Sequence, residues 1–164
     1  MWNSLFALVR DLPPEVAVVF VAMLPVVELR GAIPLGISLG VHPLEAFILG
    51  VGGNLVPVPL ILLFMEPVSA RLRRVGALRR VIDWVLGRTA ARTHRLRSYG
   101  LIGLVLFVAT PLPSTGAWTG ALGASLLGMG KRASFLAIAL GTCLAGVVVT
   151  ALSVLGMISV KTMG

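Results

Sequence analysis

Two long, uninterrupted apolar stretches constrain this chain more than any other feature. They run from Leu44 to Met65 and from Phe135 to Ile158. At 1.5 Å of rise per residue, a helix over either stretch spans the roughly 30 Å of a bilayer's hydrocarbon core. Hydrophobic residues fill 57% of the 164 positions and charged residues only 12%, which is too little polar surface for a soluble globule of this size. We therefore expect an all-α integral membrane protein.

Two shorter apolar stretches, 16–24 and 101–110, are each interrupted by proline. The interrupting residues are Pro25, Pro111 and Pro113. A helix over either stretch reaches about 15 Å, half way across the bilayer, before proline removes a backbone donor and clashes with the preceding turn. Irregular backbone at membrane depth is tolerated only where protein or water shelters it. These patterns therefore predict two re-entrant helical hairpins, broken at the three prolines.

The same order of elements occurs twice along the chain. A half-length arm, a broken turn and a returning arm, which ends at Gly40 or near Gly130, precede each long apolar stretch. Each unit crosses the membrane once in net, so the second unit starts from the opposite side. We predict one membrane domain, 1–164, of two inverted repeats over 14–65 and 99–160. Short matches at equal spacing support the repeat, Ala46-Phe47 with Gly53-Asn54 against Ser134-Phe135 with Gly141-Thr142.

A basic segment, 66–98, joins the two repeats. Nine of the 14 lysines and arginines fall between Arg71 and Arg97, which by the positive-inside rule makes the segment cytoplasmic. Its apolar residues recur at helical spacing, so we predict an amphipathic helix on the membrane surface or a solvated linker helix. We therefore attribute the net charge of +8 to the orientation of the chain in the membrane. No nucleic-acid partner is expected. The charge bias is the same for re-entrant hairpins and for four full crossings, so the prediction of hairpins rests on the prolines.

Glu28 and Arg30 are the sharpest functional signal. They lie in the first turn, within an otherwise apolar stretch, where an ionised side chain costs about 2.5–3.5 kcal/mol on insertion scales. One interpretation is structural: the two residues pair and hold the turn open. In the other, Glu28 couples transport to protons and Arg30 binds an anionic substrate group.

The remaining candidate substrate-binding residues are Pro34, Asn54, Ser114, Thr115 and Trp118. We expect Pro34 in the first turn of one returning arm and Ser114 or Thr115 as the N-cap of the other. The positive dipole ends of both arms would then converge beside the arginine, which favours an anion. Trp118 is equally well explained as a packing or interfacial aromatic. Asn54 either lines the cavity or bonds a neighbouring backbone group.

Several chemistries have no signal in the sequence. There is no Gly-Lys-Ser/Thr phosphate loop, and His42 and His94 stand without cysteine or paired carboxylates at ligand spacing. Cys143 is alone in an apolar run. We therefore expect no metal, no cofactor and no enzymatic activity, and any energy would come from an ion gradient.

Two motifs resemble a known family. They are Glu28-Leu29-Arg30-Gly31-Ala32-Ile33-Pro34 and Pro111-Leu112-Pro113-Ser114-Thr115-Gly116-Ala117-Trp118-Thr119-Gly120. Both are similar to the putative small multidrug export family, which resembles the DedA membrane proteins more distantly. The resemblance implies opposed re-entrant hairpins and a transporter-like role. Through DedA it implies proton-dependent movement of polyprenyl-phosphate lipids, with Glu28 as the acidic residue; the second hairpin departs from DedA because it lacks arginine.

The leading hypothesis is a proton-coupled transporter or flippase for an anionic or amphiphilic substrate such as a polyprenyl-phosphate-like lipid, with the site between the two hairpins. The alternatives are a proton-coupled exporter of lipophilic cations and a non-transporting scaffold that binds anionic lipid or a partner. We expect a bacterial or archaeal cell membrane as the location. Two full helices are too few to shield two hairpins from lipid, so a homodimer or larger oligomer is also expected.

Overall fold

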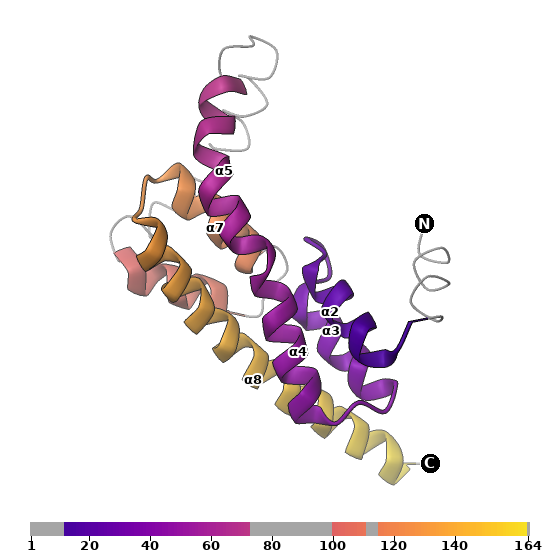
Figure 1. The fold of residues 1–164 in the computed structure, drawn as a ribbon. Helices are drawn as coiled ribbons and strands as arrows, with labels where there is room; N and C mark the ends of the chain where they lie inside the picture. Colours follow the sequence, from indigo (N-terminus) through magenta and orange to yellow (C-terminus); the bar gives the residue numbers. More distant parts are fainter. Residues whose placement is uncertain (1–11, 73–99, 111–114, 164) are drawn as a thin grey trace. The chain divides into compact units, whose positions relative to one another are not determined.

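The computed structural model describes residues 12–72, 100–110 and 115–163, and all regular structure in these ranges is helical (Figure 1). The expected all-α class is therefore confirmed for these residues. The helices are α2 (Pro14–Met23), α3 (Glu28–Ser38), α4 (Pro43–Leu55), α5 (Pro57–Leu72), an unlabelled helix over Gly100–Ala109, α7 (Ala117–Leu126) and α8 (Lys131–Met163). Most of the expected basic linker helix lies outside the described residues.

Two continuous helical stretches are long and apolar enough to cross a membrane, Pro43–Met65 and Lys131–Ser159. Both contain the apolar stretches from which crossings were predicted. The first is made of α4 and α5, which meet at Val56 (φ −54°, ψ −48°). Pro57 and Pro59 bring no N–H donors to this junction, but the Val56 N–H still donates to Gly52 O and Gly53 O. The helical conformation therefore continues through the junction, and the span is one stretch of 23 residues.

The chain divides into two compact units. The first is Met1–Val56 with Cys143–Gly164, and the second is Pro57–Thr142. In the first unit α2, α3 and α4 pack against one another, and in the second α5 packs against α7. Each unit thus contains one pair of short helices, the first part of one long helix and the last part of the other.

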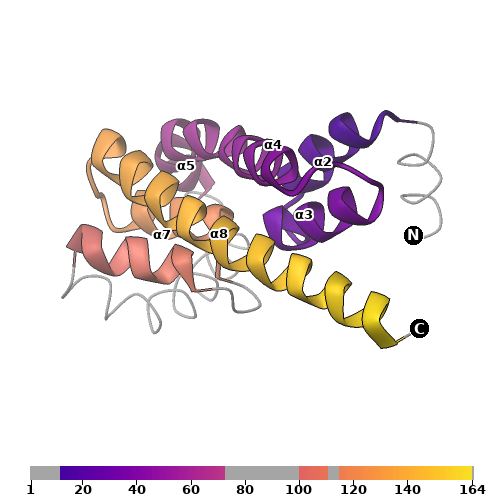
Figure 2. The same ribbon diagram turned by 90° about the horizontal axis from the view of Figure 1, so that it is seen from below.

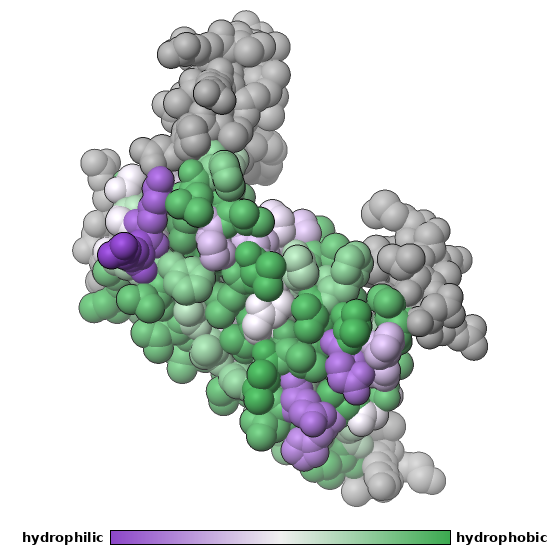
Figure 3. Space-filling model, viewed as in Figure 1, coloured by the Kyte–Doolittle hydropathy of each residue, from purple (hydrophilic) through white to green (hydrophobic). Residues whose placement is uncertain are grey.

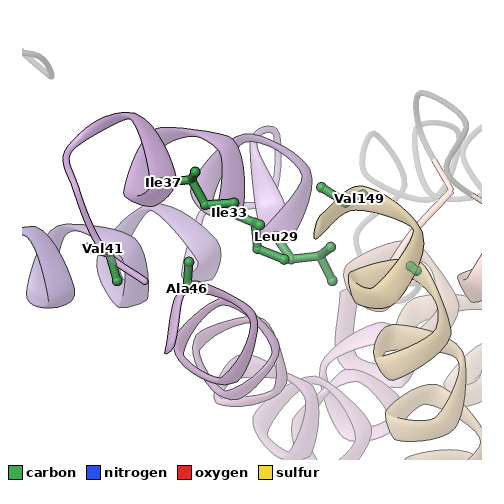
Figure 4. Packing of buried hydrophobic residues seen from close by; sticks show 7 residues of the cluster. Leu29, Ile33, Ile37, Val41, Ala46 and Val149 are labelled. Carbon is green, nitrogen blue, oxygen red and sulfur yellow. The ribbon is translucent and has the colours of Figure 1, made fainter. Parts of the chain in front are cut away.

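One apolar core of the first unit lies along a single face of α3. Leu29, Ile33 and Ile37 recur at intervals of four residues and are nearly inaccessible. They pack with Ala46 of α4 and with Val149 of α8 (Figure 4). A second cluster joins α2 to α3 and consists of Ala17, Val18, Val21, Ala22 and Ala32. The helix α3 therefore buries two faces, one against α4 and α8 and the other against α2.

The first hairpin turns at Pro25, as predicted. Leu24, the residue before the proline, is extended (φ −73°, ψ 133°), as steric contact with a following proline ring requires. The helix α2 has only 10 residues and α3 only 11, which is about 15 Å each. The arms therefore have the half-membrane length that the sequence indicated.

The position of Pro34 corrects the sequence prediction. It does not lie in the first turn of the returning arm, because α3 begins at Glu28 and Pro34 is inside the helix. A mid-helix proline removes one backbone bond and costs about 3 kcal/mol. Here burial of Leu29, Ala32 and Ile33 offsets the loss. The turn between α2 and α3 therefore covers only four residues, 24–27.

Both returning arms end in the same capping motif. After α3, the N–H of Val41 donates to Gly36 O (3.0 Å) and that of Gly40 to Ile37 O (3.1 Å). After α7, Met129 and Gly128 donate to Ala124 O and Ser125 O (3.0 and 3.2 Å). These are Schellman motifs, in which the glycine takes a positive φ; φ is 91° at Gly40 and 65° at Gly128. The two motifs are 88 residues apart, and the first residues of α4 and α8 are also 88 residues apart.

Glycine also permits one close approach in each unit. A Cβ on Gly53 of α4 would lie 2.6 Å from Val19 O of α2, and a Cβ on Gly141 of α8 would lie 2.7 Å from Val105 O. In Figure 2 the Gly100–Ala109 helix runs beside the first part of α8, in agreement with this contact. Gly53 and Gly141 are again 88 residues apart, so the same contact recurs at the same register.

The outward side chains of the long helices are large and apolar. Ile48, Leu60, Phe64, Leu140 and Leu152 are all more than half exposed. Figure 3 shows apolar residues over most of the described part of the face it presents. Water is a poor solvent for such a surface, whereas lipid tails match it.

Candidate functional site

Glu28 is the first residue of α3 and is held in an unusual conformation. It is 7% exposed, and its φ of 52° makes it the one non-glycine residue with positive φ in the described ranges. Its N–H donates to Leu24 O at 3.0 Å, which closes the hairpin turn. A left-handed conformation costs an ordinary residue about 1–2 kcal/mol. Strain of this kind clusters at functional sites, so burial and backbone together mark Glu28.

Arg30 lies two residues beyond Glu28 and is half-buried. The two residues carry opposite charges and both lie in the first turn of α3. The pair compensates part of the cost of placing either charge in an apolar bundle.

An apolar groove of about 630 Å³ opens in the first unit, further along α3. Its lining includes Pro34, Ile37 and Ser38 of α3, together with Ser153, Gly156 and Met157 of α8. Arg30 precedes Pro34 by four residues and Ile37 by seven, which places it on the same face of α3, one turn before the groove. The volume falls within the range of small-molecule sites.

The two hydroxyls in the groove are already used by their own helices. Ser38 Oγ donates to Leu35 O and Ser153 Oγ donates to Val149 O, both at 2.7 Å. A ligand in the groove therefore meets almost entirely apolar surface. The groove suits an alkyl chain or another apolar group, and the charges lie before it along α3.

The N-cap of the returning arm in the second hairpin differs from the expected one. The N-cap of α7 is Gly116, and Thr119 Oγ1 accepts a bond from its N–H at 3.0 Å. Thr115 Oγ1 instead donates to Thr110 O at 2.8 Å, across the turn. The N-cap prediction for Ser114 or Thr115 is therefore wrong, because α7 begins at Ala117 and the residue directly before it is Gly116. Trp118 lies in the first turn of α7 and is half-buried.

Three of the predicted residues lie outside the described residues: Pro111, Pro113 and Ser114. The expectation that the two hairpins meet stays a prediction, because each unit is described by itself. Asn54, another predicted residue, is 1% exposed at the end of α4, and its Oδ1 has no hydrogen-bond partner.

Thr142 was not among the predicted site residues. It is fully buried, and its Oγ1 has no hydrogen-bond partner. Thr142 follows Gly141 as Asn54 follows Gly53, so the two units carry an unsatisfied buried polar side chain at equivalent positions. Such atoms cost about 1–3 kcal/mol each. The repeated spacing in the sequence was the signal that could have identified this residue.

In the described part of the chain, no three His, Cys, Asp or Glu residues are grouped as metal ligands are. The candidate site of the first unit consists of one carboxylate, one guanidinium and the apolar groove that follows them on α3. Such a set can bind and orient an amphiphile and can hold a proton.

Comparison with known proteins agrees with the motifs. No curated protein and no solved structure matches the chain. The model of one protein family, described as "Putative small multi-drug export protein", matches residues 28–148. The match starts at Glu28 and covers both hairpin motifs and most of the long helices. With its two membrane-length helices, the chain is a membrane protein that belongs to this small multi-drug export family.

Proposed function

We propose that the protein is a proton-coupled transporter or flippase that moves an anionic amphiphile across the membrane. Glu28 takes up and releases the proton, Arg30 binds the anionic group, and the groove that follows on α3 receives the apolar chain. Family membership supports export in general. The anionic substrate, the flippase activity and the proton coupling belong to this proposal.

The observation that carries the proposal is that Glu28 is buried and has a strained backbone conformation. A carboxylate that is 7% exposed and held at positive φ is expensive in a membrane bundle, and intramembrane ionisable residues of this kind mark substrate or proton paths. A purely structural pair with Arg30 does not require the strained backbone. A residue that changes its environment during transport does gain from it, because the strain is released when the turn rearranges.

The proposed architecture is a pair of inverted repeats, each a re-entrant hairpin and a crossing helix. The four short helices are 10 or 11 residues long, about half of the bilayer thickness. The 88-residue register links the Schellman glycines, the starts of the long helices and the close contacts of Gly53 and Gly141. A duplicated unit explains all three at once.

Transport by the reconstituted full chain tests the proposal. Glu28→Gln keeps the size of the side chain and removes its titration, whereas Glu45→Gln makes the same change at an exposed position in the first turn of α4. In proteoliposomes with an imposed pH gradient, we expect E28Q to lose gradient-driven transport and E45Q to retain it. If E28Q transports at the wild-type rate and responds equally to the gradient, Glu28 is not the coupling residue.

A second candidate is the export of lipophilic cations, which the family description favours and which Glu28 could attract directly. Arg30→Gln separates the two. For an anionic substrate, removal of the guanidinium abolishes binding; for a cation, it removes a repulsive charge and transport is retained or improved. A scaffold function predicts instead that changes at Glu28 are silent and that neutralising the arginines of the basic segment abolishes function; these are Arg71, Arg73, Arg74, Arg79 and Arg80.

A further inference from the structure

A second groove, of about 440 Å³, lies in the second unit between α5 and the start of α8. Its apolar lining includes Leu62 and Leu63 of α5 and Phe135 and Leu136 of α8. The groove shares no residue with the Glu28 site or with the groove on α3. Almost all of its surface is apolar, so it suits a hydrocarbon chain.

Two cations lie at one end of this groove. Lys131 and Arg132 also belong to its lining, and both are exposed. Long basic side chains in such places bury their methylene stems and keep their charged ends at the surface. The groove therefore combines an apolar channel with a doubly positive mouth.

The two cations lie at the N-terminus of α8. They are the first two residues of the 33-residue helix, and its first turn contains no acidic residue. The N-terminus of a helix already carries about half a positive charge, which favours anions there and disfavours lysine and arginine. Two cations on this end concentrate positive charge that a bound anion would neutralise.

The location fits the headgroup layer of a bilayer. Lys131 begins the candidate membrane span Lys131–Ser159, so the cations lie at the end of the hydrocarbon region and the apolar lining lies within it. The distribution matches a phospholipid, which has a charged group at the interface and chains below it. A soluble anion would satisfy the cations but would leave the apolar channel unfilled.

We propose that this groove is a binding site for an anionic glycerophospholipid of the bilayer. Lys131 and Arg132 bind its headgroup phosphate, and one acyl chain lies against Leu62, Leu63, Phe135 and Leu136. The site binds anionic headgroups selectively at the membrane surface, and this binding does not depend on transport activity.

Lipid binding to the purified full chain tests the site. Phosphatidylglycerol and phosphatidylcholine with identical acyl chains are titrated in mild detergent, and bound lipid is counted by native mass spectrometry. The wild-type chain should prefer phosphatidylglycerol. In K131Q/R132Q the preference should fall about five-fold for each neutralised cation, the equivalent of about 1 kcal/mol per basic residue near an anionic surface. The charge-conserving K131R/R132K should keep it.

A matched pair on α5 tests the chain-binding part. Leu63 lines the groove and is 52% exposed, whereas Leu60 is 56% exposed and does not line it. L63W should lower phosphatidylglycerol binding and L60W should not. Equal wild-type binding of both lipids, an unchanged preference in K131Q/R132Q, or an equal loss in K131R/R132K would overturn the proposal. Equal binding by L63W and L60W would show that the groove does not hold the acyl chain.

Discussion

Adding one methyl group to Gly53 should destabilise the first unit, and adding it to Gly52 should not. On Gly53 the new Cβ would lie 2.6 Å from Val19 O and 3.0 Å from Ala22 Cβ. The first contact is with backbone, so α2 itself must move away from α4. On Gly52 the new Cβ meets nothing within 4 Å. The two positions are adjacent on one helix, so only the contact differs.

The magnitude follows from the geometry. Forcing an extra methyl group into a close-packed contact costs about 1–3 kcal/mol, whereas an open glycine-to-alanine change in a helix is neutral or gains up to about 1 kcal/mol. For a chain of this length, G53A should therefore melt about 2–12 °C below wild type. G52A should melt at or above the wild-type temperature.

Thermal unfolding in detergent, followed by the loss of the monodisperse peak in size-exclusion chromatography, measures the difference. The same test applies to the second unit, where a Cβ on Gly141 would lie 2.7 Å from Val105 O and G141A should show a similar loss. Equal melting of G53A and G52A would refute the close packing of α2 on α4.

Three further changes have clear expected outcomes. Glu28→Gly should melt above Glu28→Gln in the same thermal assay, by about 1 kcal/mol in stability, because glycine takes the positive φ without strain; equal stability would contradict the strain. Gly156→Leu should fill the groove on α3 and lower transport of long-chain substrates in proteoliposomes, whereas Gly52→Leu, at a position where a Cβ also meets nothing within 4 Å, should not; an equal effect would exclude the groove from substrate binding. Thr142→Val should raise the melting temperature, because it removes a buried hydroxyl without a partner, and a lower melting temperature would show that the hydroxyl is satisfied in the membrane.

The features that could be predicted from the sequence are those set by single residues or by simple composition. Apolar length located both membrane-length helices, and Pro25 located the first turn, because proline acts on its own neighbours whatever the rest of the fold does.

The features that could not be predicted depend on contacts across the fold. Pro34 was expected near a helix start because its local preference is strong, but the burial of neighbouring residues on α3 decided otherwise. Thr115 had a suitable partner within the turn that the sequence does not show. The two grooves and the unsatisfied Thr142 side chain arise only when helices distant in sequence pack together.

The central claim, that each hairpin enters and leaves the membrane on the same side, is tested most directly by the sidedness of two equivalent positions. His42 and Gly130 directly precede α4 and α8, are both exposed, and lie 88 residues apart. In a chain freed of its own thiol by Cys143→Ser, single cysteines at these positions can be labelled in intact cells with a membrane-impermeant maleimide. Re-entrant hairpins place the two on opposite faces, so only H42C should react from outside. Labelling of both from the same face would mean four complete crossings and would contradict the account.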